Sequence, residues 1–474
     1  MFVAKSSSSH NKPQLNFILI VPVVLLLVII GIFFKLNFWG NPSEMKLMRN
    51  VEGVEQPVDL KNWTVAKTVQ ETLKIQNPDA GICAVDGQLS QNGKSVNLYS
   101  YTNTQDGIWT SSKKFTADLN LNPAAEAMTA MQEGDANLKI TVKNCALFNN
   151  TTELTVALKL DLTPPRVSLT STQHYINQGG ADVATYTVSD DATWSGIRIG
   201  KHEFMGYPIP GGAPNARFAF FVYSYELPVG TAIEVIAKDA AGNIGKSTLA
   251  PSKFFPKEFR HRELNIDDGF INTKIADIIS NTSSLKNTAD PLQNFLLVNS
   301  TLRKTNAQFL KDISAKSKAQ FFWKDAFLPL VNSAVEASFA DYRSYMYGGA
   351  KVDEQVHLGF DFAGVQNMPV RASGAGQVLF SDYLGIYGNT VIVDHGYGII
   401  TLYAHLSSMD VKVGDLVAHD QKIANTGATG LAGGDHLHYS MLIQGVQTNP
   451  IEFWDQHWIE DHVYLRLNKE LFGK

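Results

Sequence analysis

The chain has 474 residues, of which 44% are hydrophobic and 18% charged, with 40 Lys and Arg against 45 Asp and Glu. These proportions are those of ordinary globular proteins and exclude a mainly disordered chain. The net charge of −5 offers no basic excess of the kind that nucleic-acid-binding domains carry, so we expect no nucleic-acid partner. At roughly 150 residues per domain, the length predicts about three domains.

An apolar segment follows the first sixteen residues. Residues 17–34 read FILIVPVVLLLVIIGIFF, long enough as a helix to cover about 27 Å of hydrocarbon. A cleaved signal peptide is the alternative, but its core is usually about 7–15 residues and precedes a small-residue cleavage site. We therefore predict a transmembrane anchor over 17–35 in the lipid bilayer of the cytoplasmic membrane. Residues 1–16 are then cytoplasmic, and the C-terminal bulk lies on the periplasmic or extracytoplasmic side.

Two β-rich modules are predicted after the anchor. Over residues 57–162, short runs alternate apolar and polar residues, which is typical of a β-sandwich. Thr163-Pro164-Pro165 ends the pattern. The second module, over 163–250, closes on DAAGNIG and resembles bacterial immunoglobulin-like modules. Its candidate strands lie at 167–171, 185–189, 218–225 and 233–238.

The two cysteines, Cys83 and Cys145, both fall in the first β-rich module. In an oxidising compartment they could form a disulfide that closes a loop of about 60 residues. Two buried free thiols are the alternative, and the sequence leaves both open.

Apolar residues recur at helical spacing between residues 262 and 318, in two runs separated by a polar segment. The runs contain Ile271, Ile275, Ile278 and Ile279, then Phe295, Val298, Leu302, Phe309 and Ile313. We predict a helical hairpin whose apolar stripes form its own packing face. Because it directly precedes the C-terminal block, we also expect the hairpin or a β-module to cover part of the cleft of that block.

Histidine is concentrated near one end of the sequence. Of the 12 histidines, eight lie in residues 357–474, and neutral imidazole is the commonest metal ligand in proteins. Three signals stand out there. His357 and Asp361 point to one side of an extended chain, and so do His436 and His438. His405 ends a predicted strand that pairs with residues 390–394.

Each signal alone is weak, because isolated histidines are usually packing or surface residues. Together they form a set with a known chemistry. Two histidines and one carboxylate are a catalytic zinc set that leaves one coordination position for water, whose pKa the ion lowers to about 7. Two further histidines on that face could orient the water, accept its proton and stabilise an oxyanion.

These residues stand in longer strings: HLGFDFA, MPVRASGAGQV, GIYGNTVIVDHGYGIITLYAHLSSMDVKVGD and TGATGLAGGDHLHYSM. In this order they resemble the lysostaphin/LytM-type zinc metallopeptidases, which cleave peptide cross-links of bacterial peptidoglycan. The resemblance implies a peptidase domain over 345–453 that binds one Zn²⁺ ion. It makes His357, Asp361 and His438 the zinc ligands, and His405 and His436 the catalytic pair.

The predicted protein is thus multidomain and mainly β, with a C-terminal antiparallel-β metallopeptidase domain and a last helix over 454–474. We expect a membrane-anchored zinc endopeptidase that acts on peptidoglycan. A non-catalytic activator of cell-wall amidases is the alternative, and an adhesion protein a third. The remaining residues of interest are assigned to structure: His419 to the surface, His395 to a hairpin tip, His457 and His462 to packing, and Asn389 to a turn or to substrate contact.

Overall fold

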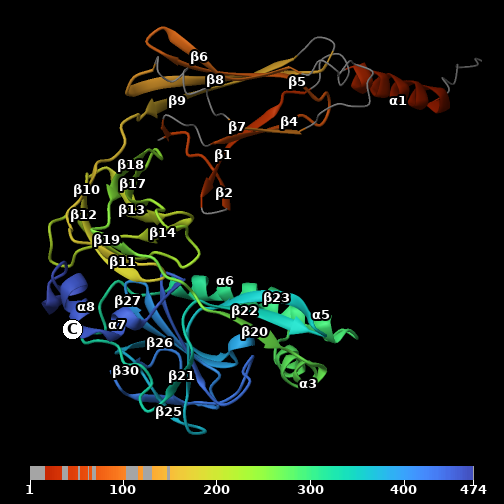
Figure 1. The fold of residues 1–474 in the computed structure, drawn as a ribbon. Helices are drawn as coiled ribbons and strands as arrows, with labels where there is room; N and C mark the ends of the chain where they lie inside the picture. Colours follow the sequence, from red (N-terminus) through yellow and green to blue (C-terminus); the bar gives the residue numbers. More distant parts are fainter. Residues whose placement is uncertain are drawn as a thin grey trace, which may run out of the picture. The chain divides into compact units, whose positions relative to one another are not determined.

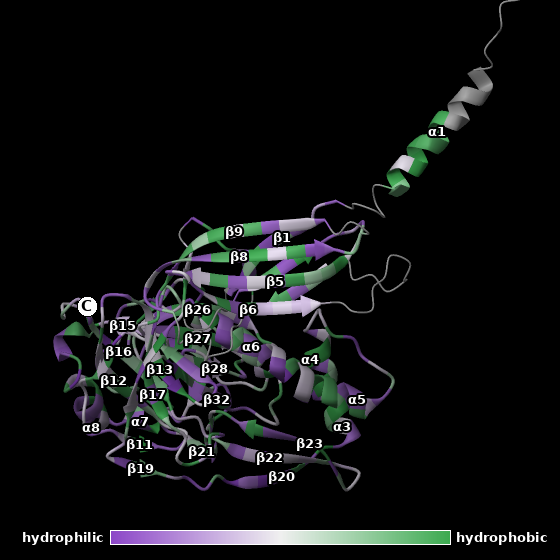
Figure 2. Ribbon diagram, turned by 90° about the horizontal axis from the view of Figure 1, so that it is seen from above, coloured by the Kyte–Doolittle hydropathy of each residue, from purple (hydrophilic) through white to green (hydrophobic). Residues whose placement is uncertain are grey.

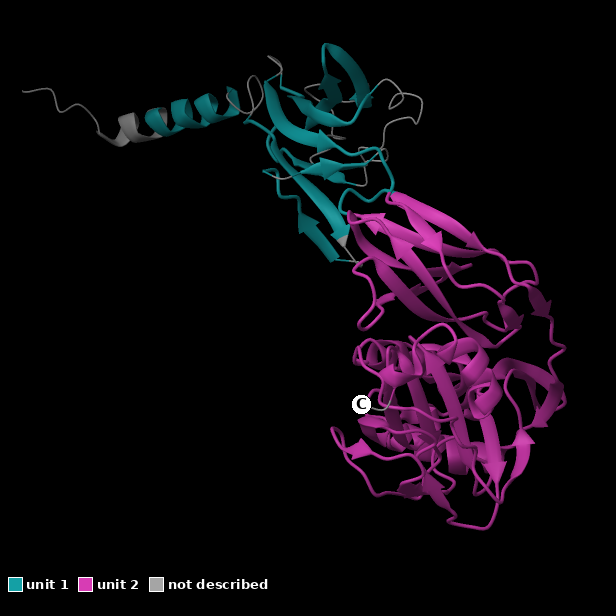
Figure 3. Ribbon diagram, turned by 90° about the vertical axis from the view of Figure 1, so that its left-hand side faces the viewer, with its two compact units in different colours: residues 1–164, 240–243 teal, residues 165–239, 244–474 magenta. Residues whose placement is uncertain are grey.

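The computed structural model describes residues 17–34, 41–51, 54–61, 63–66, 71–102, 116–120, 131–146 and 150–472. The chain divides into two compact units. Unit 1 comprises residues 1–164 and 240–243, and unit 2 comprises 165–239 and 244–474 (Figure 3). Each unit is described by itself.

Helix α1 (Phe17–Phe34) coincides with the apolar segment, and its coloured part is hydrophobic in Figure 2. No helix in the described part of the chain has both the length and the apolar character that a membrane crossing requires. The anchor over 17–35 stays a prediction. Residues 1–16, predicted to be cytoplasmic, lie outside the described residues.

Unit 1 contains two antiparallel-rich sheets, of four strands (β2-β1-β4-β7) and five strands (β3-β9-β8-β5-β6). Their strands are β1 (Glu44–Val51), β2 (Val54–Pro57), β3 (Thr64–Val65), β4 (Thr72–Gln76), β5 (Ile82–Gln91), β6 (Lys94–Thr102), β7 (Thr116–Asn120), β8 (Gly134–Asn144) and β9 (Thr151–Leu160). Alternate residues along β8, among them Leu138, Ile140 and Val142, are buried, as the period of a half-buried strand requires. β1 begins at Glu44, ahead of the predicted start at residue 57.

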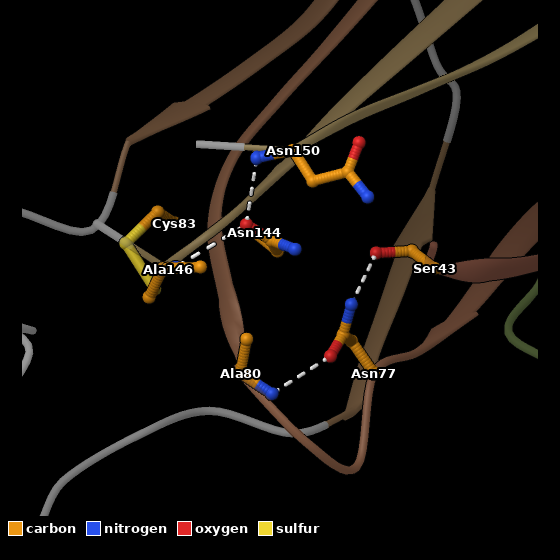
Figure 4. The surroundings of a disulfide bond; sticks show 8 residues. Ser43, Asn77, Ala80, Cys83, Asn144, Ala146 and Asn150 are labelled. Atoms are coloured by element: carbon orange, nitrogen blue, oxygen red, sulfur yellow. Dashed lines mark hydrogen bonds between the residues drawn. A yellow bond between two sulfur atoms is a disulfide. The ribbon is translucent and has the colours of Figure 1, made fainter. Parts of the chain in front are cut away.

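Cys83 and Cys145 form a disulfide across a separation of 62 residues (Figure 4). Of the two alternatives left open by the sequence, the structure has the bridge. Asn144 lies beside it and accepts hydrogen bonds from the backbone N–H groups of Ala146 and Asn150. The bridge therefore ties the start of β5 to the end of β8, where Asn144 is held by these hydrogen bonds.

The first part of unit 2 is a module of two four-stranded sheets, β10-β12-β16-β15 and β14-β13-β17-β18, with a small parallel pair β11-β19. The strands are β10 (Val167–Leu169), β11 (Tyr175–Asn177), β12 (Ala181–Val188), β13 (Ala192–Ile199), β14 (His202–Met205), β15 (Tyr207–Pro208), β16 (Ala216–Val222), β17 (Ile233–Asp239), β18 (Ile244–Leu249) and β19 (Lys253–Phe255). Residues Phe218 to Val222 are buried in succession rather than alternately. The outer face of β16 also packs on the rest of unit 2, where the rings of Phe218 and Phe321 are 5.8 Å apart.

The hairpin region forms two helical segments, each interrupted by a π-helical turn. They are α3 (Asp268–Phe270), η2 (Ile271–Ile275) and α4 (Ala276–Ser280), then α5 (Pro291–Leu296), η3 (Leu297–Leu302) and α6 (Arg303–Ser314). Asp267 and Asp290 cap the two starts by accepting backbone N–H groups. Leu310 and Ile313 of α6 pack on buried residues of the large sheet described next. The second helical segment is therefore part of that sheet's core.

The C-terminal block of unit 2 is built around a sheet in the order β21-β24-β32-β28-β27-β26-β30, with β33 paired to β32. Figure 1 labels β21, β26, β27 and β30 of this sheet. Its strands are β21 (Ala334–Ala337), β24 (Phe360–Ala363), β26 (Gly376–Tyr383), β27 (Asn389–Gly396), β28 (Ile399–Ala404), β30 (Leu416–Val417), β32 (Leu437–Ile443) and β33 (Val446–Thr448). Two three-stranded sheets, β20-β22-β23 and β25-β31-β29, complete the block. They contain β20 (His261–Asn265), β22 (Asp341–Tyr347), β23 (Ala350–His357), β25 (Pro369–Arg371), β29 (Ser408–Met409) and β31 (Lys422–Asn425).

The C-terminal segment is not the single helix predicted over 454–474. It forms α7 (Ile451–Trp454), α8 (Gln456–Trp458), η5 (Ile459–Tyr464) and η6 (Lys469–Leu471). The break falls at Asp455, whose backbone is extended because it ends α7 and caps α8 by accepting the N–H of His457.

This segment is bound to the β-module through a buried group that we call the Asp182 cluster: Asp182, His174, His462 and Arg466. The carboxylate of Asp182 lies 2.6 Å from His174 Nδ1 and 3.0 Å from His462 Nδ1, and it accepts a hydrogen bond from Arg466 Nη1. Burial opposes ionisation, but hydrogen bonds from the two histidines and the charge of Arg466 lower the pKa of Asp182.

Candidate active site

Two sheets bring together the three residues predicted to bind zinc, His357, Asp361 and His438, which we call the metal trio. Asp361 on β24 and His438 on β32 are directly opposite each other in antiparallel register. His357 ends β23, in a different sheet, and the chain reaches β24 through a break that includes Gly359. A Cβ at Gly359 would lie only 2.5 Å from the carbonyl oxygen of Tyr439. The close approach of the two segments therefore requires glycine.

One donor atom from each member of the metal trio points to a common centre. The distances are 2.9 Å from His357 Nε2 to Asp361 Oδ1, 2.9 Å from His357 Nε2 to His438 Nδ1, and 3.0 Å from His438 Nδ1 to Asp361 Oδ1. All three residues are buried. Zinc bonds of about 2.0–2.2 Å place tetrahedral ligands roughly 3.3–3.6 Å apart, so the three donor atoms lie a few tenths of an ångström closer together than zinc would hold them.

The outer ring nitrogens fix the tautomers of both histidines. His357 Nδ1 lies 3.0 Å from the carbonyl oxygen of Ser338, to which it can only donate. His438 Nε2 lies 2.9 Å from Ser440 Oγ, whose own proton is donated to the carbonyl of Leu358. Both inward nitrogens therefore present lone pairs, and they face each other beside a carboxylate. Such a concentration of acceptors is what a cation needs and what protein groups alone do not satisfy.

Arg343 on β22 completes the environment of Asp361. Its Nη2 donates to Asp361 Oδ2 at 3.0 Å, which leaves Oδ1 to the metal trio. β22 pairs with β23 in a register that sets Arg343 opposite Gln355 and Asp341 opposite His357. The same ladder therefore positions the guanidinium and the first histidine on one face of the sheet.

His405 lies directly after β28 with a left-handed backbone, φ 61°. Its N–H donates to the carbonyl of Tyr387, and its Nδ1 lies 2.8 Å from the carbonyl oxygen of Thr429. Nδ1 is thus the protonated nitrogen, and Nε2 is left with a lone pair. Asn389 supports this arrangement, because its N–H donates to Thr429 Oγ1 and its side-chain amide donates to Leu406.

His436 is the other predicted catalytic residue. Its ring centroid lies 4.8 Å from that of His405, and its Nε2 lies 3.6 Å from Asp361 Oδ1. Its Nδ1 lies 2.9 Å from the carbonyl oxygen of Gly434. The structure therefore places both predicted catalytic histidines beside the metal trio, and their roles stay predictions.

The two catalytic candidates have opposite protonation tendencies. Burial, together with repulsion from His436 and His438, holds the pKa of His405 well below its usual range. Burial also opposes charge on His436, but the nearby negative charge of Asp361 raises its pKa. A neutral imidazole thus lies beside one that retains a proton more readily, a pairing suited to acid–base chemistry.

The metal trio opens into a cavity of about 280 Å³ whose walls come from several parts of unit 2. The lining includes Leu264, Asn265, Ile266 and Phe270, the two arginines Arg303 and Arg343, and Leu431 and Gly433 from the loop before His436. The hairpin thus forms part of the wall, and Lys274 Nζ also donates to the carbonyl of Ala428 in that loop. That this covering restrains activity stays a prediction.

The four other histidines of this region lie away from the metal trio. His419 is exposed, as expected. His395 is not at a hairpin tip: it is fully buried at a bulge in β27, between the carbonyl of Ala375 and Thr401 Oγ1, and burial lowers its pKa to about 4. His457 does not pack but is exposed beside Asp461, whereas His462 is buried in the Asp182 cluster.

Sequence reasoning missed the two arginines of the cavity. Arg343 lies in DYRSYMY, two residues from an acid and in a run that reads as an ordinary strand, and Arg303 stands in a helical stripe. Only the position of Arg343 in the strand preceding the His357 strand offered a signal, because neighbouring strands commonly pair.

Comparison with known proteins finds a family match in the C-terminal block of unit 2. Residues 355–450 match the model of Peptidase family M23. Over 97 residues the chain is 42% identical to the DD-carboxypeptidase/endopeptidase Mpg of Neisseria meningitidis serogroup B. This aligned segment covers 20% of this chain and 22% of that protein. It is 36% identical over 129 residues to the peptidoglycan DD-endopeptidase ShyC of Vibrio cholerae, with 27% and 29% covered. The matched segments thus span under a third of these relatives.

Among solved structures, the chain is similar to the catalytic domain of lysostaphin from Staphylococcus simulans. The identity is 25%, the coverage is 31% of this chain and 96% of that one, and the TM-score is 0.20. A peptidase M23 structure from Pseudomonas aeruginosa covers 58% of this chain and 94% of its own, with 19% identity and a TM-score of 0.35.

Proposed function

From the premise that residues 355–450 form a domain of peptidase family M23, we propose that the chain is a membrane-anchored zinc endopeptidase. Its substrate is the peptide part of bacterial peptidoglycan. The names of its relatives, a DD-carboxypeptidase/endopeptidase and a peptidoglycan DD-endopeptidase, support this substrate. The resemblance of the sequence to lysostaphin/LytM-type metallopeptidases also implies cleavage of peptide bonds in peptidoglycan.

The observation that carries the proposal is the convergence of lone pairs in the metal trio. Both inward imidazole nitrogens are acceptors, because their outer partners Ser338 and Ser440 take the ring protons. Zinc bound there would activate a water molecule and polarise the scissile carbonyl. The three side chains are buried and held by paired strands, so the site needs little rearrangement.

The two neighbouring histidines divide the proton chemistry. His405 offers the neutral Nε2 as general base, since Nδ1 is committed to the carbonyl of Thr429. His436, which Asp361 keeps more basic, donates a hydrogen bond through Nε2 to the developing oxyanion and then a proton toward the leaving amine. Arg343 holds Asp361 in place.

The alternative function is a non-catalytic activator of cell-wall amidases, which would not need a working metal site. The presence of His405 and His436 beside an intact metal trio favours the enzyme. An adhesion role would leave the same five residues without a purpose.

The cellular setting is also part of the proposal. We place the bulk of the chain on the extracytoplasmic side, held by the apolar segment 17–35. The disulfide between Cys83 and Cys145 supports an oxidising compartment. The β-strands of unit 1, from β1 to β9, then lie between the anchor and the peptidase in the sequence, as a spacer would.

The decisive experiment incubates the purified full chain with isolated sacculi, with zinc, after chelation, and after zinc is restored. We expect release of peptide-cleaved muropeptides with zinc only, and mass analysis of the products identifies the bond. No release under any zinc or pH condition would overturn the enzyme. Stimulation of a separate amidase by the chelated chain would favour the activator.

A further inference from the structure

Arg303, the first residue of α6, carries a guanidinium that the protein holds in place without neutralising it. Its Nε donates to the carbonyl of Asn299 at 3.0 Å, and its Nη2 donates to Asn299 Oδ1 at 2.7 Å. Asn299 is fully buried, and its amide donates in turn to Asp353 Oδ2 at 2.8 Å. The orientation of Arg303 is therefore fixed through both the backbone and the side chain of one buried residue.

No carboxylate among the described residues lies within 4.0 Å of this guanidinium. The other arginine that lines the cavity, Arg343, has such a partner in Asp361. Asp353, the acid nearest to Arg303 in the hydrogen-bond network, is already engaged by Asn299, Ser300 and Gln355. The edge of the guanidinium that Asn299 does not use remains available to an incoming acceptor.

Arg303 shares its surroundings with the metal trio. It lines the 280 Å³ cavity that contains His357, Asp361 and His438, and it also lines an adjoining cavity of about 80 Å³ with His357 and His438. Asp361 is the only carboxylate in either lining, and Arg343 balances its charge. With a dication on the metal trio, this cleft carries a net positive charge that attracts anions.

We propose that Arg303 binds a free carboxylate of the substrate peptide next to the cleaved bond. The substrates of this chain are thus anionic peptides, recognised by the planar fork that a guanidinium offers a carboxylate. The carboxylate belongs either to the chain end or to a side chain beside the bond. This inference rests on the proposed function, because it names the substrate class of the same site.

The test compares matched synthetic peptides with the zinc-loaded full chain. One peptide has both carboxylates free, one has the terminal carboxylate amidated, and one has the side-chain carboxylate beside the bond amidated. For the natural chain we expect one amidation to lower kcat/KM by about 10- to 100-fold, mainly through KM, because a charge-assisted hydrogen bond is lost. The peptide that suffers the loss identifies the source of the carboxylate.

Arg303→Gln should lower kcat/KM for the free carboxylate to the level of the amidated peptide and remove the difference between them. Arg303→Lys keeps the charge without the fork and should retain part of the preference. Lys304→Gln is the matched control, since Lys304 is the exposed neighbour on the same helix, and it should leave the preference unchanged. Zinc content of each variant checks that the site is intact.

Equal hydrolysis of all three peptides by the natural chain would overturn the inference, and so would a preference that survives Arg303→Gln. If no peptide is hydrolysed, the proposed function fails and binding decides the inference separately. Calorimetry with the zinc-loaded chain should then show tighter binding of the free-carboxylate peptide, and Arg303→Gln should remove that advantage. Equal or absent binding would overturn it.

Discussion

Unit 2 contains two buried clusters of histidine and aspartate that look alike in composition and differ in purpose. In the metal trio, two histidines surround Asp361 at 2.9 and 3.0 Å. In the Asp182 cluster, two histidines surround Asp182 at 2.6 and 3.0 Å. Distance and burial alone do not separate them.

The difference lies in the balance of donors and acceptors. Asp182 accepts from Arg466 and from the backbone N–H of Val183 as well as from two imidazole N–H groups, so its lone pairs are satisfied. In the metal trio the imidazole protons point outward to Ser338 and Ser440, and the inward atoms are all acceptors. A surplus of lone pairs, rather than the nearness of histidine to aspartate, therefore distinguishes the proposed metal site.

The largest expected effect distinguishes the clusters through their histidines. His438→Ala removes one member of the metal trio, so zinc content and hydrolysis should both fall to background. His462→Ala, in the Asp182 cluster, should keep one zinc per chain and most of the activity. Metal analysis of the purified proteins and a sacculus assay measure both. Stoichiometric zinc in His438→Ala would contradict the assignment of the ligands.

The next effect concerns a histidine that touches the metal trio without belonging to it. His436→Ala should lower kcat by a factor on the order of 10² to 10⁴, because acid–base assistance is lost, while zinc is retained. His419→Ala, on the exposed surface, is the control and should change neither quantity. Full activity in His436→Ala would show that its assigned role is wrong.

Breaking the other cluster should affect stability rather than chemistry. Asp182→Asn leaves the buried Arg466 without its counter-charge, so the free energy of unfolding should fall by about 3–5 kcal/mol at neutral pH. Glu203→Gln removes an exposed ion-pair partner of Lys238 and should cost about 1 kcal/mol or less. Urea denaturation of zinc-loaded chains measures both changes.

The effect of Asp182→Asn on the free energy of unfolding should also depend on pH. Because the folded pKa of Asp182 is lowered, its ionised form stabilises the fold above the unfolded pKa of about 3.9. That contribution is lost progressively as the pH falls below this value. The stability gap between the natural chain and Asp182→Asn should therefore narrow between neutral pH and about pH 3. A gap that widens toward acid would contradict the ion pairing.

The smallest effect concerns the outer oxygen of Asp361. Arg343→Gln removes the charged donor 3.0 Å from Oδ2, and zinc affinity should fall by roughly 10- to 100-fold, as for other residues that orient a metal ligand. Competition with a chelator of known affinity measures this without an activity assay. Arg371→Gln, at an exposed site, is the control. Unchanged zinc affinity would show that Asp361 keeps its position in the metal trio without Arg343.

The sequence anticipated those parts of the site that follow from local periodicity. His436 and His438 share a face because residues two apart on a strand do so, and the pairing of β27 with β28 places His405 at a strand end. Local pattern was weaker for His357 and Asp361, which meet through a break at Gly359 and two different sheets. The resemblance to known peptidases, rather than spacing, supplied their roles.

What the sequence could not show depends on contacts between distant residues. The buried position of His395 is set by the bulge in β27 and the carbonyl of Ala375. The Asp182 cluster joins residues 284 positions apart, and Arg303 reaches the cleft only because the hairpin packs there. No local sequence pattern predicts such long-range contacts. They arise when secondary-structure elements pack together, and the periodicity of one element does not say which other element it will pack against.

The separation of Asp182 from Arg466 also has a consequence for biogenesis. A contact across 284 residues is slow to form, because closing so large a loop costs chain entropy before the contact can stabilise the fold. Every member of the metal trio is synthesised before Arg466, yet the carboxylate buried in β12 lacks its guanidinium partner until that residue emerges. Unit 2 therefore cannot complete this buried contact until residue 466 has been synthesised, when all three residues of the metal trio are already part of the chain.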